Sequence, residues 1–256
     1  VEIAGTAGHD VDMDGFTACM EDQKARARAN AKGDAWGSFN DVWVELSDKV
    51  AATEFDGYDN DVIEGVKVVA IVRNGESVES AAAGEDVEVV LDRTPFYAEM
   101  GGQQGDAGEL SAEGVVLTVA DTKNHNGLYA HVAHVAEGTL AVGAAVTAAL
   151  DAERRGFLRR NHTATHLLDA ALKQVLGEHV SQAGSLVTPE HLRFDFTHFE
   201  ALSSEQLKAV EDLVNQQIFA SKPVVTRVMG IDEAKAGGAV ALFGEKYGDV
   251  VRVVSV

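Results

Sequence analysis

Cysteine and positive charge are both scarce in this chain of 256 residues. Cys19 is its only cysteine, so a disulfide framework is excluded, and this usage is typical of a reducing compartment such as the cytosol. Lysine and arginine number 21 against 41 aspartate and glutamate residues, which gives a formal net charge of −20. Broad, non-specific binding of nucleic acid is therefore disfavoured, because it depends on neutralising phosphates.

Long hydrophobic runs are also lacking. No stretch reaches the roughly 18 to 20 uncharged apolar residues that a membrane-spanning helix needs, so we expect no membrane partner. The first residues show no basic region followed by an apolar one, so the sequence predicts no signal peptide and a cytoplasmic protein. The chain begins at Val1 without methionine and ends in an apolar run, from which we expect a fragment of a longer protein.

Residues 1–61 are predicted to form a mainly helical segment. Apolar residues recur at helical spacing between about Asp10 and Asn30, and a shorter helix is indicated around Phe39 to Leu46. Glycines and the turn sequence from Asp56 to Asp59 interrupt this region before the pattern changes.

Residues 62–150 are predicted to form a small β-barrel. A β-branched run at Val66–Val72 is followed by Asn74-Gly75, a strong signal for a hairpin turn. Four further strands are expected, at Val87–Leu91, Val115–Val119, Leu128–Val135 and Ala145–Leu150. His131 and His134 fall on opposite faces of one of these strands, and we interpret both as polar residues at the surface or barrel rim.

Residues 151–256 mix helices and strands without a regular β-α-β spacing. A long helix after Ala152 ends at Gly177, a loop at Val180–Ser185 precedes a strand at Leu192–Phe196, and Ser203 with Gln206 matches a capping box. The next helix carries Leu207, Val210, Val214 and Ile218 on one side, and a strand at Val224–Met229, a short helix and a final strand follow. The predicted fold class is therefore α+β, with a sheet packed on helices in this last part.

His162 and His166 stand four residues apart in the long helix, so both imidazoles lie on one of its faces. Two neutral imidazoles can share a tetrahedral metal ion, for which zinc is the expected metal, but they fill only half of its coordination shell. A zinc protease would place glutamate directly after the first histidine, where this chain has Thr163, so protease activity is disfavoured. A surface pair without metal remains the alternative.

A glycine-rich loop between Thr94 and Gly108 is the second feature that points to a ligand. Glycines allow the backbone to approach a ligand closely and to present N–H donors, although a tight barrel loop without a ligand has the same composition. The spacing matches neither G-x-G-x-x-G nor a Walker sequence, so a mononucleotide phosphate loop is not supported.

Together these motifs resemble the alanyl-tRNA synthetase family. The resemblance rests on the glycine-rich loop, the arginines and histidines from Arg154 to His166, the sequence from His179 to Leu186, Leu192–Phe196, and Ala241–Tyr247. It implies that residues 1–61 are the tail of a tRNA-recognition region, 62–150 a barrel module, and 151–256 an editing domain that hydrolyses mischarged seryl- or glycyl-tRNA. ATP and magnesium would serve a separate ligase domain, and homo-oligomerisation would use a further C-terminal region.

The resemblance also assigns residues to roles. His162 and His166 would be zinc ligands, completed by a cysteine and a histidine beyond Val256. Gln182, Gly101, Gly102 and Gln103 are candidates for holding the ester or a water, and Arg155, Arg159 and Arg193 for contacting tRNA. For Arg193 the alternative is a structural ion pair with Asp195, because both side chains lie on one face of the strand. Two other functions stay open: a non-catalytic tRNA-binding spacer and a free-standing editing hydrolase.

Overall fold

The computed structural model describes residues 12–13, 15–17, 19–20, 35–239 and 248–255. These residues form two compact units, the first running to Arg159 and including Thr188–Glu190, the second containing the remainder from Arg160. The motif Ala241–Tyr247 and most of the expected helix between Asp10 and Asn30 lie outside the described residues. Both helices and sheets are present, so the predicted α+β class is confirmed.

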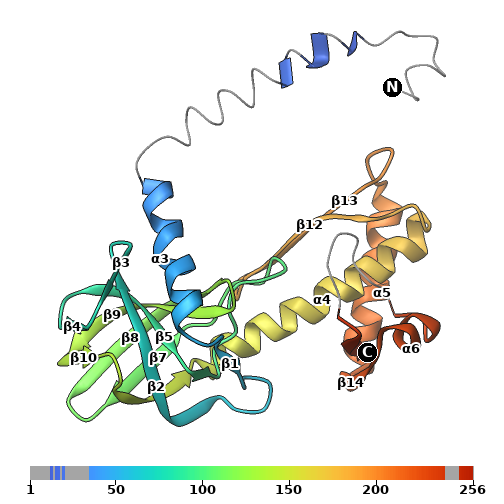
Figure 1. Cartoon of the computed structure of the whole chain (residues 1–256). Helices are drawn as coiled ribbons and strands as arrows, with labels where there is room; N and C mark the ends of the chain where they lie inside the picture. The colour runs from blue at the N-terminus through green and yellow to red at the C-terminus, as the bar shows by residue number, and fades with distance from the viewer. Residues whose placement is uncertain (1–11, 14, 18, 21–34, 240–247, 256) are drawn as a thin grey trace. The chain divides into compact units, whose positions relative to one another are not determined.

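A closed barrel of six strands makes up most of the first unit (Figure 1). Around the barrel the strands follow the order β2 (Val62–Arg73), β5 (Asp86–Leu91), β9 (Leu128–Glu137), β8 (Val115–His125), β7 (Gly108–Ala112) and β11 (Ala145–Leu150). Antiparallel pairing of β11 with β2 closes it, which leaves no open edge between these strands. Short strands supplement the barrel: β1 (Glu54–Phe55) with β6 (Arg93–Thr94), β4 (Ser80–Ala82) with β10 (Thr139–Ala141), and β3 (Glu76–Val78) beside β2.

The hairpin predicted at Asn74-Gly75 is confirmed and joins β2 to β3. Asn74 has φ 54° and Gly75 has φ 80°, so both residues adopt the left-handed conformation that a two-residue hairpin turn requires. Asparagine and glycine are the residues that tolerate it best, which is why this local sequence predicted the turn.

Two apolar clusters explain why strand β2 reads as a nearly continuous hydrophobic run. Val68 and Ile71 belong to the core inside the barrel, while Ala70 and Val72 belong to a second cluster. In that cluster helix α3 (Ala35–Lys49) contributes Trp43, which is 3% exposed. Because both faces of β2 are buried, its sequence lacks the alternation of apolar and polar residues that a strand with one solvent-exposed face would show.

The second unit contains helices and two small sheets. Its elements are the second part of α4 (Ala152–Leu176), β12 (Gln182–Val187), β13 (Leu192–Phe196), α5 (Ser204–Ala220), β14 (Val225–Gly230), α6 (Ile231–Ala236) and β15 (Val250–Ser255). β12 pairs with β13 and β14 with β15, both antiparallel. The loop predicted at Val180–Ser185 is wrong from Gln182 onward, because these residues pair with Phe196 to Phe194 as a strand.

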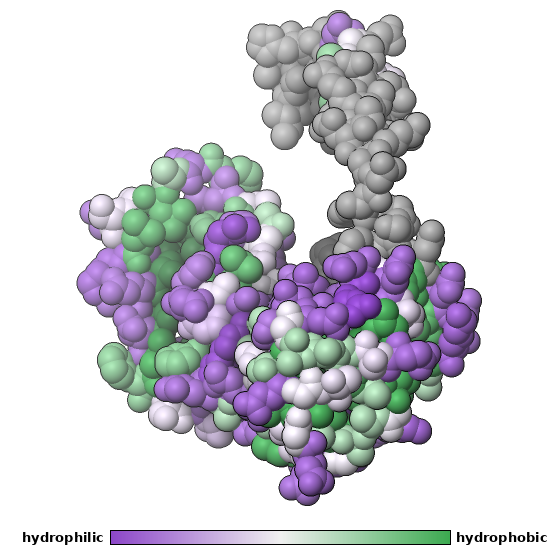
Figure 2. Space-filling model, turned by 90° about the vertical axis from the view of Figure 1, so that its left-hand side faces the viewer, coloured by the Kyte–Doolittle hydropathy of each residue, from purple (hydrophilic) through white to green (hydrophobic). Residues whose placement is uncertain are grey.

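Helix α5 begins with the predicted capping box. Ser203 Oγ accepts from the Gln206 N–H at 3.2 Å, and Gln206 Oε1 accepts from the Ser203 N–H at 2.8 Å. Its predicted apolar side is only partly covered, since Val210 is buried whereas Leu207 is 56% and Ile218 51% exposed. None of the described helices is long and apolar enough to cross a membrane. Hydrophilic residues cover much of the face in Figure 2, with smaller apolar areas between them, as the many acidic residues lead one to expect.

Candidate functional site

His162 and His166 lie side by side on α4, as their spacing predicts. The two ring centroids are 5.1 Å apart and the ring planes are inclined by only 22°. His166 is exposed, whereas His162 is partly buried. The helix therefore presents two imidazoles, one turn apart, to the same side.

The surroundings of His162 favour its neutral form. Burial lowers the pKa of His162 below its usual value, and the neighbouring His166 lowers it further. A neutral imidazole is the form that binds zinc, so the pair suits half of a tetrahedral site. Among the described residues, no third histidine, cysteine or carboxylate joins these two into a set of metal ligands.

Gln182 begins strand β12 and lies opposite Phe196 at the end of β13. Phe196 packs in the same apolar cluster as Leu168 and Leu172 of α4, so this end of the hairpin lies against the helix that carries the histidine pair. Gln182 is exposed, which leaves its amide accessible to water or a ligand.

Arg193 and Asp195 form the ion pair that was the structural alternative for these residues. Arg193 Nη2 lies 3.2 Å from Asp195 Oδ2, and the two side chains are 62% and 47% exposed. Gly184 makes room for this carboxylate, because a Cβ there would lie 2.7 Å from Asp195 Oδ2. An ion pair this exposed contributes at most about 1 kcal/mol, so Arg193 can exchange its partner for a phosphate at little cost.

The tip of the glycine-rich loop is a tight turn in the first unit. Met100 and Gln103 exchange backbone hydrogen bonds of 3.3 and 3.1 Å across Gly101 and Gly102. Both glycines have positive φ values, 62° and 82°, and a Cβ on Gly101 would meet no atom within 4 Å. The turn thus leaves open space in front of Gly101, while Gln103 is only 8% exposed.

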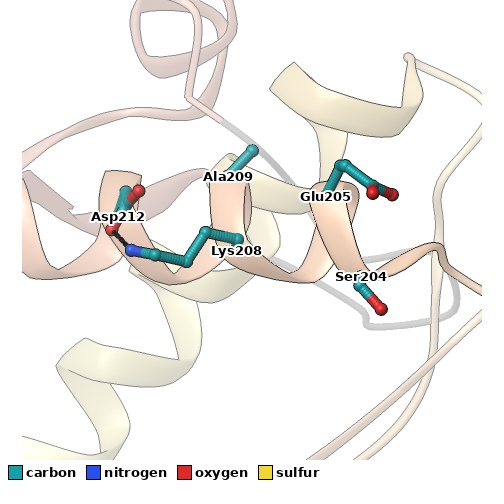
Figure 3. Close-up of a pocket in the computed structure, with 5 residues that line it drawn as sticks. All are labelled: Ser204, Glu205, Lys208, Ala209 and Asp212. Carbon is teal, nitrogen blue, oxygen red and sulfur yellow. Dashed lines mark hydrogen bonds and ion pairs between the residues drawn. The ribbon is translucent and has the colours of Figure 1, made fainter.

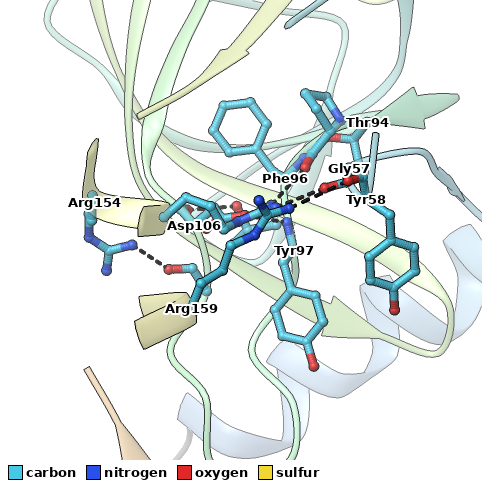
Figure 4. Close-up of polar contacts among 12 residues, drawn as sticks. Gly57, Tyr58, Thr94, Phe96, Tyr97, Asp106, Arg154 and Arg159 are labelled. Carbon is cyan, nitrogen blue, oxygen red and sulfur yellow. Dashed lines mark hydrogen bonds and ion pairs between the residues drawn. The ribbon is translucent and has the colours of Figure 1, made fainter. Parts of the chain in front are cut away.

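Arg155 is buried, which contradicts its predicted contact with tRNA. It is 5% exposed, and its guanidinium donates to both carboxylate oxygens of Asp106, which is 1% exposed. It also donates to the carbonyl oxygens of Gly57 at 2.8 Å and Pro95 at 3.0 Å (Figure 4). These partners use its donors within the protein, so Arg155 joins the first turns of α4 to the turn at Gly57 and to both ends of the glycine-rich loop.

Two glycines make this network possible. A Cβ on Gly57 would lie 1.9 Å from the Pro95 oxygen, and a Cβ on Gly105 would lie 2.1 Å from the Thr122 oxygen. Asp106 in turn accepts from the Tyr97 N–H at 2.7 Å. Sequence reasoning identified a glycine-rich segment with close backbone approaches but missed Asp106, and no local signal marks it as the partner of Arg155.

Arg159 is exposed and donates to the Tyr58 carbonyl oxygen at 3.4 Å. It therefore remains a candidate for contacting RNA, unlike its neighbour on the preceding turn.

His131 is fully buried, so its interpretation as a surface or rim residue is wrong. Its Nδ1 donates to the Val89 carbonyl oxygen at 2.8 Å, and its Nε2 accepts from the Thr94 hydroxyl at 2.7 Å. Burial lowers the pKa of His131 to about 4. His134 does lie at the surface, where its Nδ1 is 2.7 Å from Asp86 Oδ1.

The depression drawn in Figure 3 offers no further site. It is lined by Ser204, Glu205, Lys208, Ala209 and Asp212, all from the exposed side of α5, and Lys208 pairs there with Asp212. Side chains from a single helix do not enclose a ligand. None of the predicted site residues lines it.

Comparison with known proteins identifies the family. The family model described as tRNA synthetases class II (A) matches residues 1–154, more than half of the chain. The chain belongs to the class II (A) tRNA synthetases. The match ends before the histidine pair of α4.

Similar proteins extend the comparison to 97% of the chain. Alanine--tRNA ligases from Sinorhizobium medicae (strain WSM419), Rhizobium meliloti (strain 1021) and Chelativorans sp. (strain BNC1) are 55%, 53% and 49% identical to it over 249 residues. These 249 residues cover 28% of each ligase, so the chain spans about that share of their length. The resemblance to alanyl-tRNA synthetases is thereby confirmed.

Proposed function

We propose that this chain is the barrel and editing region of an alanine--tRNA ligase, in which it hydrolyses seryl- or glycyl-tRNA. The parent enzyme would attach alanine to its tRNA using ATP and magnesium in a separate domain, in the cytoplasm. The stacked pair of His162 and His166 carries the proposal, because it supplies half of a zinc site in a chain so similar to these ligases.

Editing corrects errors that an alanine-binding pocket cannot prevent, because the pocket distinguishes alanine from similar amino acids only weakly. Glycine is smaller than alanine and enters the same pocket. Serine differs from alanine by one hydroxyl group, which increases the size of the side chain too little for the pocket to reject serine strongly. A second site that hydrolyses the wrong ester raises the overall accuracy.

The proposed roles follow from the chemistry of each group. His162 and His166 would hold zinc with ligands from outside the described residues, and bound zinc would orient the aminoacyl group or polarise a water. Orientation is favoured, because Thr163 rather than a carboxylate follows His162. The exposed amide of Gln182 would hold the ester carbonyl or a water, and the turn at Gly101–Gln103 would present backbone N–H groups to the aminoacyl end. Arg159 and Arg193 would contact the acceptor end of tRNA.

The test is deacylation of seryl-tRNA made with alanine tRNA, using this chain and any longer native form that contains it. His162→Ala and His166→Ala should lower hydrolysis at least about tenfold and remove bound zinc, as measured by elemental analysis of the purified protein. His134→Ala is the matched control, since it removes an exposed histidine of the barrel. Hydrolysis that His162→Ala leaves unchanged would refute the catalytic role of the pair.

The two other functions give different results. A non-catalytic spacer binds tRNA but shows neither hydrolysis nor zinc in any form of the protein. A free-standing hydrolase is disfavoured because the similar ligases are much longer than this chain. It predicts full deacylation by a native protein without a ligase domain.

A further inference from the structure

Three of the four tyrosines in the chain gather around one phenylalanine in the first unit. The ring centroid of Phe55 lies 4.9 Å from that of Tyr58, 5.9 Å from that of Tyr97 and 6.0 Å from that of Tyr129. We call these four residues the tyrosine surface. Aromatic residues are only 6% of the chain, so their concentration at one place calls for an explanation.

The tyrosine surface is built on a rigid frame. β1 pairs with β6, which places Phe55 opposite Thr94, and the Tyr129 N–H donates to Thr53 Oγ1 at 3.1 Å. Tyr97 is held by Asp106 through its N–H, and the residue before Tyr58 accepts from Arg155. The backbone that carries the rings is therefore held in place before any ligand arrives, which lowers the entropy lost on binding.

The rings are accessible as well as ordered. Tyr58 is 50% exposed, while Tyr97 and Tyr129 are partly buried. Burial raises the pKa of Tyr129, and the nearby Tyr58 raises it further. Figure 4 shows the rings of Tyr58 and Tyr97 projecting to the same side, away from the buried ion pair.

Positive charge accompanies the rings although the chain is strongly acidic. Arg159 donates to the Tyr58 carbonyl oxygen, and Arg154 donates to that of Gly105 at 2.8 Å. Asp56 and Asp59 flank Tyr58 in sequence and equal the two arginines in number, so there is no local excess of positive charge. A ligand here gains more from ring contacts than from phosphate neutralisation.

We propose that the tyrosine surface binds single-stranded RNA, specifically the unpaired 3′ end of tRNA, by stacking bases on its rings. This proposal rests on the proposed tRNA-editing function. Bases expose their faces only when unpaired, and stacking on aromatic side chains is tolerant of sequence, as a segment shared by all tRNAs requires. With one arginine, Arg159, in contact with the tyrosine surface, the logarithm of the affinity should fall with the logarithm of the salt concentration with a slope of only about −0.7.

Fluorescence anisotropy with a labelled six-nucleotide RNA ending in CCA tests this surface. Tyr58→Leu keeps an apolar side chain without the ring and should weaken binding about fivefold or more, whereas Tyr58→Phe should bind as the wild type does. Arg159→Gln should reduce the salt slope by about 0.7. Phe219→Leu is the matched control, because Phe219 is an aromatic residue that is 84% exposed and belongs to α5 of the second unit.

Equal binding by wild type and Tyr58→Leu, or tighter binding to the same RNA in a duplex, overturns the proposal. Deacylation of seryl-tRNA by the same proteins separates it from the editing function. If the wild type hydrolyses the ester and Tyr58→Leu still binds RNA normally, the tyrosine surface alone is refuted. If the wild type does not hydrolyse it but Tyr58→Leu loses RNA binding, the surface stands and editing is refuted.

Discussion

Removing one partner of the Arg155–Asp106 pair should strongly destabilise the first unit. Asp106→Asn keeps the size of the side chain but leaves the guanidinium, 5% exposed, without a negative partner. Breaking a buried ion pair from one side typically costs about 3 to 5 kcal/mol, because the remaining charge is neither solvated nor neutralised. The carbonyl oxygens of Gly57 and Pro95 still accept from Arg155, which places the expected loss toward the lower end of this range.

Tryptophan fluorescence measures this loss of stability in the first unit. Both tryptophans of the chain, Trp36 and Trp43, belong to α3, and Trp43 packs on the barrel. Urea unfolding followed by this signal therefore reports on the first unit. For a unit of this size, about 3 to 5 kcal/mol corresponds to a fall in Tm of roughly 6 to 20 °C.

The matched control is Glu45→Gln, the same change from carboxylate to amide in an exposed pair. Glu45 pairs with Lys49 at 3.4 Å, and their side chains are 70% and 68% exposed, so the variant should lose no more than about 0.5 kcal/mol. The double variant Arg155→Met/Asp106→Leu should lose less stability than the sum of the losses of the two single variants. The reason is that the double variant leaves no unpaired buried charge. A loss below about 1 kcal/mol in Asp106→Asn would refute the structural role assigned to Arg155.

Two further predictions concern the barrel. Burial lowers the pKa of His131 to about 4, against 6.5 for an ordinary histidine. As the pH falls, His131 is therefore protonated in the unfolded chain before it is protonated in the folded one. Stability should therefore drop by about 3 kcal/mol between pH 6.5 and 4, and urea titrations of His131→Leu should show a weaker pH dependence; equal slopes would contradict this. In the glycine-rich loop, Gly105→Ala should cost about 3 kcal/mol, because its Cβ would meet the Thr122 oxygen, whereas Gly101→Ala should cost about 1 kcal/mol through its φ of 62° alone. Thermal unfolding of both variants checks this order, and equal losses would refute it.

The barrel strands could be predicted because their signal is local. β-branched runs separated by glycine and asparagine turns indicated five of its six strands. β7 was missed because its sequence, GELSA, has a single large apolar residue and owes its position to pairing with β8 and β11. Pairing of this kind depends on distant segments and leaves no periodic pattern in the strand itself.

The arginines before the histidine pair show that local sequence does not predict which side chain is buried. Arg154, Arg155, Arg159 and Arg160 form one basic run, and nothing within it distinguishes a buried member from an exposed one. Arg155 is buried only because Asp106, 49 residues earlier, supplies a carboxylate in a loop whose glycines allow close approach. The histidine pair was predictable because its geometry depends on the helix alone.

Helical spacing connects the anchor of α4 with its candidate metal ligands. Arg155, Arg159, His162 and His166 are separated by four, three and four residues, so they form one stripe along a continuous helix. Along this stripe the environment changes from a buried ion pair to an exposed arginine and then to two stacked imidazoles. Arg155 and Arg159 belong to the first unit, and His162 and His166 to the second. A buried arginine therefore serves structure at one end of the stripe, and two histidines remain available for chemistry at the other.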